Sequence, residues 1–144
     1  MHPSARTGPE AEEGKLPIAT PIHVVVCRQY VRKLADSLQF SDTDATKLVT
    51  AASELARNAL IHGGGGEMCW WIVREDNRWG VKLSFVDQGP GIADVDTAMT
   101  DGWTSGRGMG LGLPGARRLV NEFEIESSGS RGTRVTITRW TLSR

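Results

Sequence analysis

Hydrophobic residues at helical spacing predict two long helices in the first half of the chain. The first begins at Thr20-Pro21, where an N-cap threonine precedes proline at the first helical position, and runs to about residue 38. The β-branched run at residues 24–26 leaves a strand there as the competing interpretation. The second begins at residues 41–44, whose sequence matches a capping box, and ends near His62, before four glycines.

Short apolar runs separated by polar or glycine-rich turns predict four strands in the rest of the chain. The strands are expected at residues 67–74, 79–87, 124–127 and 133–140. Three further segments are expected between them: a short helix at 94–100, a glycine-rich loop at 102–112, and a helix that carries Leu113 to Phe123 on its apolar side. Helices and strands are partly segregated in this order, which favours a two-layer α/β sandwich over a parallel βαβ fold.

The composition is that of a single folded domain. The chain has 144 residues, 39% of them hydrophobic and 24% charged, which fits one globular domain rather than a disordered segment. Residues 1–15 are rich in proline, glycine and charged side chains, so we expect them to form a flexible tail. The domain is then expected to span residues 16–144.

Charge and cysteine content restrict the partners and the compartment. The 17 Lys and Arg residues balance the 17 Asp and Glu residues, so the excess positive charge typical of nucleic-acid-binding proteins is missing. No apolar run reaches the roughly 18 residues that a membrane span needs. Two cysteines without CxxC spacing favour a reducing compartment. We therefore expect a cytoplasmic protein that binds neither nucleic acid nor membrane.

Glu54 and Asn58 are the first candidate functional pair. They are four residues apart in the second predicted helix, so their side chains share one helix face, distinct from the apolar face of that helix. A carboxylate beside a carboxamide suits a magnesium site, because Mg²⁺ prefers hard oxygen ligands and the carboxylate supplies a nearby base. The alternative is that both are solvated helix residues.

A second candidate motif, Asp87-Gln88-Gly89-Pro90-Gly91, follows directly after a predicted strand. Gly89 and Gly91 supply backbone conformations that other residues avoid and allow a ligand to approach closely. The Asp87 carboxylate can accept a hydrogen bond from an amine such as the exocyclic group of adenine. An ordinary glycine-proline turn is the alternative.

The third candidate is the loop at residues 106–113, in which glycine occupies every second position up to Gly112. The loop ends where a helix is predicted to start, and free backbone N–H groups at a helix start favour phosphate. A Walker A motif is excluded because the chain has no Gly-Lys-Ser/Thr triplet, and the GxGxxG match at 110–115 has no strand before it. A flexible linker is the alternative. The glycine turn at residues 129–133 is explained by a hairpin alone.

The order of these four motifs resembles the GHKL ATP-binding superfamily, whose members carry N, G1, G2 and G3 boxes in this order. Within it, the chain is most similar to the small anti-sigma-factor serine/threonine kinases, and among those to the stressosome switch kinases. The likeness rests on residues 51–58, 87–92 and 101–119 and extends more loosely over about residues 16–140. It implies an α/β (α+β) sandwich of the Bergerat type, with a mixed, mainly antiparallel sheet covered by helices.

The resemblance also implies a role for each matching residue. Asn58 would hold the Mg²⁺ that bridges the phosphates of ATP, and Glu54 would be the general base. Asp87 would bind the adenine amine, with Thr133 supporting it through its hydroxyl. The turn and the lid over the phosphates would supply the other nucleotide-binding residues: Gly89, Gly91, Gly106, Gly108, Gly110, Leu111 and Gly112.

Two arginines inside these motifs keep open roles. Arg57 lies next to Asn58, where a surface ion pair is the simplest interpretation, and Arg107 in the lid could meet a phosphate or a protein partner.

The resemblance implies an ATP-dependent protein serine/threonine kinase that phosphorylates a STAS-domain antagonist. Such kinases are released by the phosphorylated antagonist and move to a phosphatase, so they regulate stress or sigma-factor signalling by switching partners. Two alternatives stay open at this point. One is an anti-sigma factor whose main output is sequestration of a sigma subunit, and the other is a non-catalytic ATP-binding interaction module.

Overall fold

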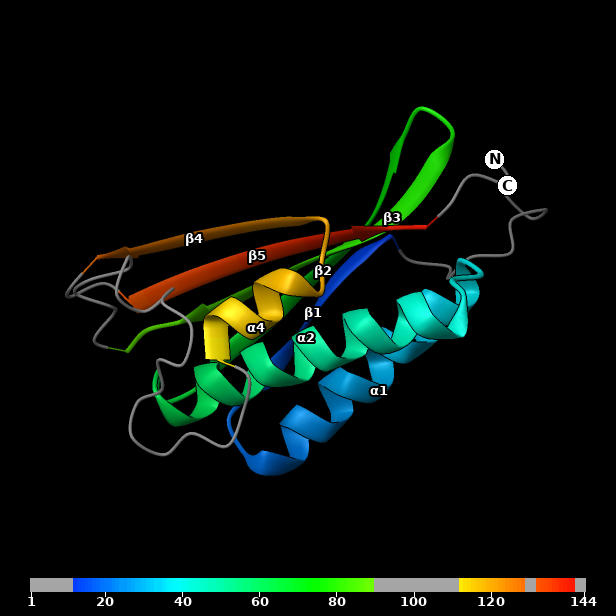
Figure 1. Ribbon diagram of the computed structural model, residues 1–144. Coiled ribbons are helices and arrows are strands. Elements are labelled where there is room, and N and C mark those ends of the chain that lie inside the picture. The colour runs from blue at the N-terminus through cyan, green and yellow to red at the C-terminus, as the bar shows by residue number, and fades with distance from the viewer. Residues whose placement is uncertain (1–11, 90–111, 129–131, 142–144) are drawn as a thin grey trace.

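A five-stranded sheet forms one layer of the protein and the helices form the other (Figure 1). A computed structural model describes residues 12–89, 112–128 and 132–141. The strands are β1 (Glu13–Ile18), β2 (Gly66–Glu75), β3 (Arg78–Asp87), β4 (Glu122–Ser128) and β5 (Gly132–Trp140). The helices are α1 (Pro21–Ser37), α2 (Asp42–Ile61) and α4 (Gly112–Arg118). The expected helix at 94–100 and the glycine-rich loop before Gly112 lie outside the described residues.

The strand order is β1-β2-β3-β5-β4, and every neighbouring pair is antiparallel. The predicted two-layer sandwich is confirmed by the sheet layer and the helix layer. The sheet was expected to be mixed and mainly antiparallel, and the described strands contain no parallel pair. The register places Gly66 and Thr133 on either side of Asp87. One end of the sheet thus gathers the start of β2, the end of β3 and the start of β5.

β1 is an element that the hydrophobic pattern did not predict. Residues 13–15, expected in the tail, are part of this strand, which pairs with β2 through positions such as Leu16↔Met68 and Ile18↔Gly66. Pro17 and the charged residues before it have low strand propensity, so the sequence pattern does not indicate a strand here. Proline is tolerated because β1 is an edge strand, where one side of the backbone needs no sheet partner.

The third predicted helix is shorter than expected. It was expected to carry Phe123, but α4 ends at Arg118 and Phe123 belongs to β4. The apolar spacing of this segment fits both structures, because Phe123 and Ile125 also alternate as core-facing positions of a strand. Pairing of β4 with β5 decided between them.

The two long helices begin close to their predicted positions, by different means. Ser41 Oγ accepts a hydrogen bond from the Asp44 N–H at 3.1 Å, which confirms the predicted N-cap of α2. Thr20 is the N-cap of α1 but makes no side-chain cap hydrogen bond; Pro21 follows it as predicted. The β-branched run at 24–26 is helical, because Val24 lies on the buried face of α1.

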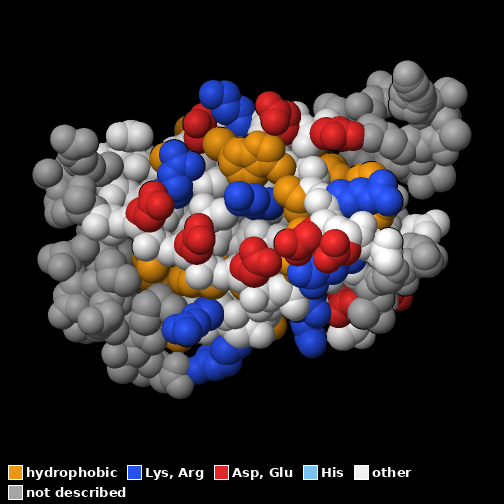
Figure 2. All heavy atoms as spheres, turned by 90° about the horizontal axis from the view of Figure 1, so that it is seen from above, with side chains coloured by type: hydrophobic (Ala, Val, Ile, Leu, Met, Phe, Trp, Pro, Cys, Tyr) orange, Lys and Arg blue, Asp and Glu red, His pale blue; other side chains and the backbone are white. Residues whose placement is uncertain are grey.

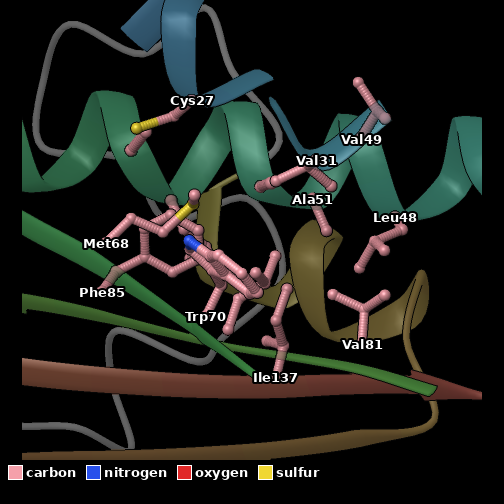
Figure 3. Packing of buried hydrophobic residues seen from close by; sticks show 14 of the residues in the cluster. Cys27, Val31, Leu48, Val49, Ala51, Met68, Trp70, Val81, Phe85 and Ile137 are labelled. Carbon is pink, nitrogen blue, oxygen red and sulfur yellow. The ribbon is translucent and has the colours of Figure 1, made fainter. Parts of the chain in front are cut away.

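The core lies between the helices and one face of the sheet. Figure 3 shows Met68, Trp70 and Phe85 of the sheet beneath α1 and α2. Trp70 is 3% exposed and its ring centroid lies 5.3 Å from that of Tyr30. Trp71 is only half-buried, as expected for adjacent strand residues on opposite faces.

The opposite face of the sheet is polar and mixed in charge. In Figure 2, Lys and Arg side chains alternate with Asp and Glu side chains around smaller hydrophobic patches. The Lys82 amine lies 5.7 Å from the centre of the Trp71 ring, and Arg134 donates to the Ser84 hydroxyl at 3.3 Å. In the described part of the chain, no helix has both the length and the apolar character needed to cross a membrane.

An ion pair ties the start of α2 to the last strand. Arg139 Nη2 lies 2.6 Å from Asp44 Oδ1, and Arg139 Nη1 donates to the main-chain oxygen of Leu119 at 2.9 Å. The Arg139 side chain is 13% exposed and that of Asp44 is 24% exposed. The hydrogen bond from Arg139 is the main reason that the pKa of Asp44 lies below its ordinary value of 3.8.

Replacing Asp44 with Asn is expected to lower the free energy of unfolding by about 1–3 kcal/mol at pH 7, because a partly buried guanidinium loses its counter-ion. Since the folded-state pKa of Asp44 is lowered, its stabilising effect is complete above the unfolded-state value and is lost as the pH falls through the folded-state value. Urea unfolding should therefore show a difference between wild type and variant that shrinks below pH 3.8. Asp42→Asn, in the same exposed helical turn, is the matched control. An equal loss in both variants would assign the effect to the helix dipole instead of the ion pair.

Candidate functional site

Helix α2 holds Glu54 and Asn58 on one face, one turn apart, near the end that reaches the sheet. Glu54 is buried and Asn58 is half-buried. Glu54 Oε1 accepts from Arg57 Nη1 at 3.3 Å, and Glu54 Oε2 accepts from the N–H of Gly112 at 3.2 Å. The Asn58 carboxamide makes no hydrogen bond with any residue that the structure describes, so its oxygen is available to a ligand.

Asp87 lies at the last position of β3, half-buried. Its Oδ1 accepts from the N–H of Gly89 at 2.9 Å, which fixes the plane of the carboxylate. The other oxygen, Oδ2, lies on the side of Gly63. One oxygen is therefore occupied by the turn that follows β3, and the second is left for a donor from outside.

Three glycines pack against Asp87 and its turn so closely that no side chain fits at them. A Cβ on Gly63 would overlap the Asp87 carboxyl group, and a Cβ on Gly132 would overlap the Asp87 main-chain carbonyl. A Cβ on Gly89 would lie 2.6 Å from the Cα of Gly63. Gly132 also has φ +86°, a conformation that favours glycine. These glycines let the end of α2, the end of β3 and the start of β5 meet at Asp87.

The meeting point is a cavity with apolar walls and a polar end. Its lining residues are Leu55, Asn58, Ala59, His62, Gly63, Phe85, Asp87, Leu113, Thr133 and Val135. Apolar walls suit a flat aromatic ring, and a carboxylate oxygen beside them suits an amino group on that ring. The cavity therefore has the chemistry of an adenine site.

The structure brings together most of the predicted residues that it describes. Asn58, Asp87 and Thr133 line the cavity, and Gly89 lies beside Asp87. Glu54 is not in the lining, but Gly112, which is bonded to it, precedes the lining residue Leu113. The remaining predicted nucleotide-binding residues lie outside the described residues: Gly91, Gly106, Gly108, Gly110, Leu111.

Two predicted residues have partners in the structure that the sequence did not suggest. The Thr133 hydroxyl is hydrogen-bonded to the Ser127 hydroxyl at 3.0 Å, although Thr133 lies opposite Asp87 in the sheet register. Support of Asp87 by that hydroxyl stays a prediction. Gly112, expected in the phosphate lid, is the first residue of α4 and gives its N–H to Glu54.

Other residues of the site were not predicted from the sequence. Gly63 was interpreted only as a helix stop, and Gly132 belonged to the fourth motif but was given no role in the site. His62 lies in the lining, whereas the sequence offered it no role. A run of glycines directly after a helix that carries polar candidates is the one signal that could have pointed to this contact.

Magnesium fits this donor set only together with a nucleotide. The described residues contain no group of three or more His, Cys, Asp or Glu side chains that could hold a metal ion. A carboxamide oxygen such as that of Asn58 is a hard ligand, and Mg²⁺ is commonly held by one or two protein oxygens with substrate phosphates supplying others. Asn58 would therefore be a protein ligand to Mg²⁺ that arrives with ATP.

Comparison with known proteins places this chain in a family. Residues 43–143 match the family described as histidine kinase-, DNA gyrase B- and HSP90-like ATPases. The matched region contains α2 except for its first residue, strands β2 to β5 and every residue of the cavity lining. The cavity therefore lies within the part of the chain that matches this ATPase family.

Two relatives illustrate what this chain is similar to. Serine/threonine-protein kinase RsbT of Bacillus subtilis (strain 168) is 38% identical over 123 residues, which are 85% of this chain and 92% of RsbT. Anti-sigma F factor of Caldanaerobacter subterraneus subsp. tengcongensis is 28% identical over 78% of this chain and 82% of that protein.

A solved structure shares the fold. The crystal structure of the RsbU and RsbW domains of a Mycobacterium tuberculosis protein superposes with a TM-score of 0.64 and 20% identity. The superposition covers 93% of this chain and 34% of that one. The chain belongs to the histidine kinase-, DNA gyrase B- and HSP90-like ATPase family, and within it is a serine/threonine-protein kinase similar to RsbT.

Proposed function

We propose that this kinase binds Mg·ATP in the cavity between α2 and the end of the sheet and phosphorylates a serine or threonine of a STAS-domain antagonist. The observation that carries the proposal is the convergence of Asn58, Asp87 and Thr133, from three different elements, on one apolar-walled cavity. Glu54 lies one helical turn from Asn58. Its carboxylate would therefore lie close to the phosphates of a nucleotide bound at Asn58, where it could act as a base.

Each residue has a role that follows from its position. Asp87 accepts a hydrogen bond from the adenine amine, and Asn58 would hold Mg²⁺, which would offset the negative charge of the phosphates. Glu54 takes the proton of the attacking hydroxyl. Transfer of this kind depends mainly on positioning and charge stabilisation, with one residue orienting the nucleophile.

Partner switching completes the proposed function. Phosphorylation adds a charge of roughly −1.5 to −2 to the antagonist at the interface with the kinase. Beside carboxylates such as that of Glu54 this charge is repelled, so the antagonist leaves and the kinase is free to bind and activate a phosphatase. These exchanges, and the use of ATP, support a cytoplasmic location for the protein.

The direct test is transfer of label from γ-labelled ATP to candidate STAS-domain proteins in the presence of Mg²⁺. We expect one STAS protein to be labelled on Ser or Thr, with no labelling after that residue is changed to Ala or after addition of EDTA. A pull-down with unmodified and phosphomimetic STAS protein should retain only the unmodified form. Nucleotide binding without transfer to any STAS protein would favour a non-catalytic module, and co-purification with a sigma subunit would favour an anti-sigma factor.

A further inference from the structure

Both oxygens of the Glu54 carboxylate are held, each by one donor and from two different elements. Arg57 Nη1 lies 3.3 Å from Oε1 within α2, and the N–H of Gly112, at the start of α4, lies 3.2 Å from Oε2. Two donors on opposite oxygens fix the plane of the carboxylate. Among the described residues, Arg57 is the only cation within ion-pair distance of Glu54.

Stability alone does not account for this ion pair. The Arg57 side chain is 46% exposed whereas that of Glu54 is 8% exposed, and the two are three residues apart on a helix. Ion pairs at this spacing with a solvated partner contribute little to stability. A carboxylate in a buried position nevertheless needs compensating donors to hold its charge in one orientation.

We propose that Arg57 is a positioning residue for phosphoryl transfer, acting through Glu54; the inference rests on the proposed role of Glu54 as the base. In the transfer, the acceptor hydroxyl oxygen bonds to the γ-phosphorus, its proton passes to the Glu54 carboxylate, and the bond to the β–γ bridging oxygen breaks to leave ADP. A base must hold its accepting oxygen about 2.6–3.2 Å from the hydroxyl oxygen that carries this proton. Without Arg57, the carboxylate is anchored only at Gly112 and turns away from that geometry.

The first test replaces Arg57 with Gln and with Lys and measures steady-state transfer to the STAS protein. We expect Arg57→Gln to lower kcat about 10- to 100-fold, since misplacing a reacting group by about 1 Å has effects of this size. KM for ATP and for the STAS protein should stay within about twofold of wild type, because the lost contact serves the transition state only. Arg57→Lys should recover part of kcat, because the ammonium group remains a charged donor.

The chain offers a matched control in Arg78. Arg78 Nη2 lies 2.8 Å from Glu75 Oε1, again three residues apart, at the β2–β3 turn, which extends away from the helices in Figure 1. Arg78→Gln removes the same kind of ion pair away from the site. We expect unchanged kcat in this variant.

A double-mutant cycle separates this inference from the function on which it rests. In a Glu54→Gln background, Arg57→Gln should cause no further loss of kcat, because the residue through which it acts is already disabled. An additive loss, or a rise in KM for the STAS protein without a fall in kcat, would overturn the positioning role and make Arg57 a separate contact. Full kcat in Arg57→Gln with an inactive Glu54→Gln would refute the inference alone. Full kcat in Glu54→Gln would refute the base assignment and the inference with it.

Discussion

Replacing Asp87 with Asn is expected to weaken ATP binding about 100-fold or more, the largest effect on nucleotide affinity of any single change at this site. The Gly89 N–H needs an acceptor at the position that Asp87 Oδ1 occupies, so the Asn side-chain oxygen turns toward Gly89. The amide NH₂ group then occupies the place of Oδ2. A donor there faces the adenine amine, which is also a donor, so a charge-assisted hydrogen bond is replaced by two groups without partners.

Titration calorimetry with ATP measures this loss. Asp76→Asn is the matched control: Asp76 is an exposed turn residue with φ 55°, and Asn tolerates that conformation as Asp does. Wild-type affinity in Asp76→Asn, with far-ultraviolet circular dichroism unchanged in both variants, would assign the loss to the site. If Asp87→Asn binds ATP as wild type does, the adenine assignment is wrong.

Replacing Glu54 with Gln is expected to lower the rate of phosphoryl transfer about 10²- to 10⁴-fold, the usual contribution of a general base. ATP binding should be retained, because Asn58 and Asp87, which hold the nucleotide in this proposal, are unchanged. Gln is preferred to Ala because Glu54 is buried and truncation would leave a cavity. Its amide oxygen can still accept one of the two donors, from Arg57 or from Gly112.

Single-turnover transfer at saturating ATP, measured beside calorimetry, separates chemistry from binding. Glu75→Gln, which breaks a more exposed Glu–Arg pair at the same spacing, is the control and should transfer at the wild-type rate. If the Glu54→Gln variant transfers phosphate at the wild-type rate, Glu54 is not the base, and its role is structural, through its hydrogen bond with the Gly112 N–H. A variant that loses ATP affinity to the same extent as activity would place Glu54 in the binding site instead.

Local signals were sufficient for several elements. The capping box at Ser41 marked the start of α2, because the cap needs only its own backbone neighbours. The two strands of the β2–β3 hairpin were predicted within one residue at each end, since alternation and a polar turn are also local. Two segments were predicted wrongly because their structure depends on long-range pairing. Residues 13–15 form part of β1 because they pair with β2, and Phe123 lies in a strand because β4 pairs with β5.

For the site, the sequence by itself indicated which side chains are candidates for the chemistry. It also determined that Glu54 and Asn58 share a helix face, because one helical turn sets that geometry. It also placed Asp87 at a strand end. Only the tertiary structure decided that Asp87 and Asn58 line one cavity, that Gly63 and Gly132 must lack side chains, and that the Gly112 N–H is bonded to Glu54. These contacts join elements far apart in the chain, and they depend on how the helices pack on the sheet, which no local pattern encodes.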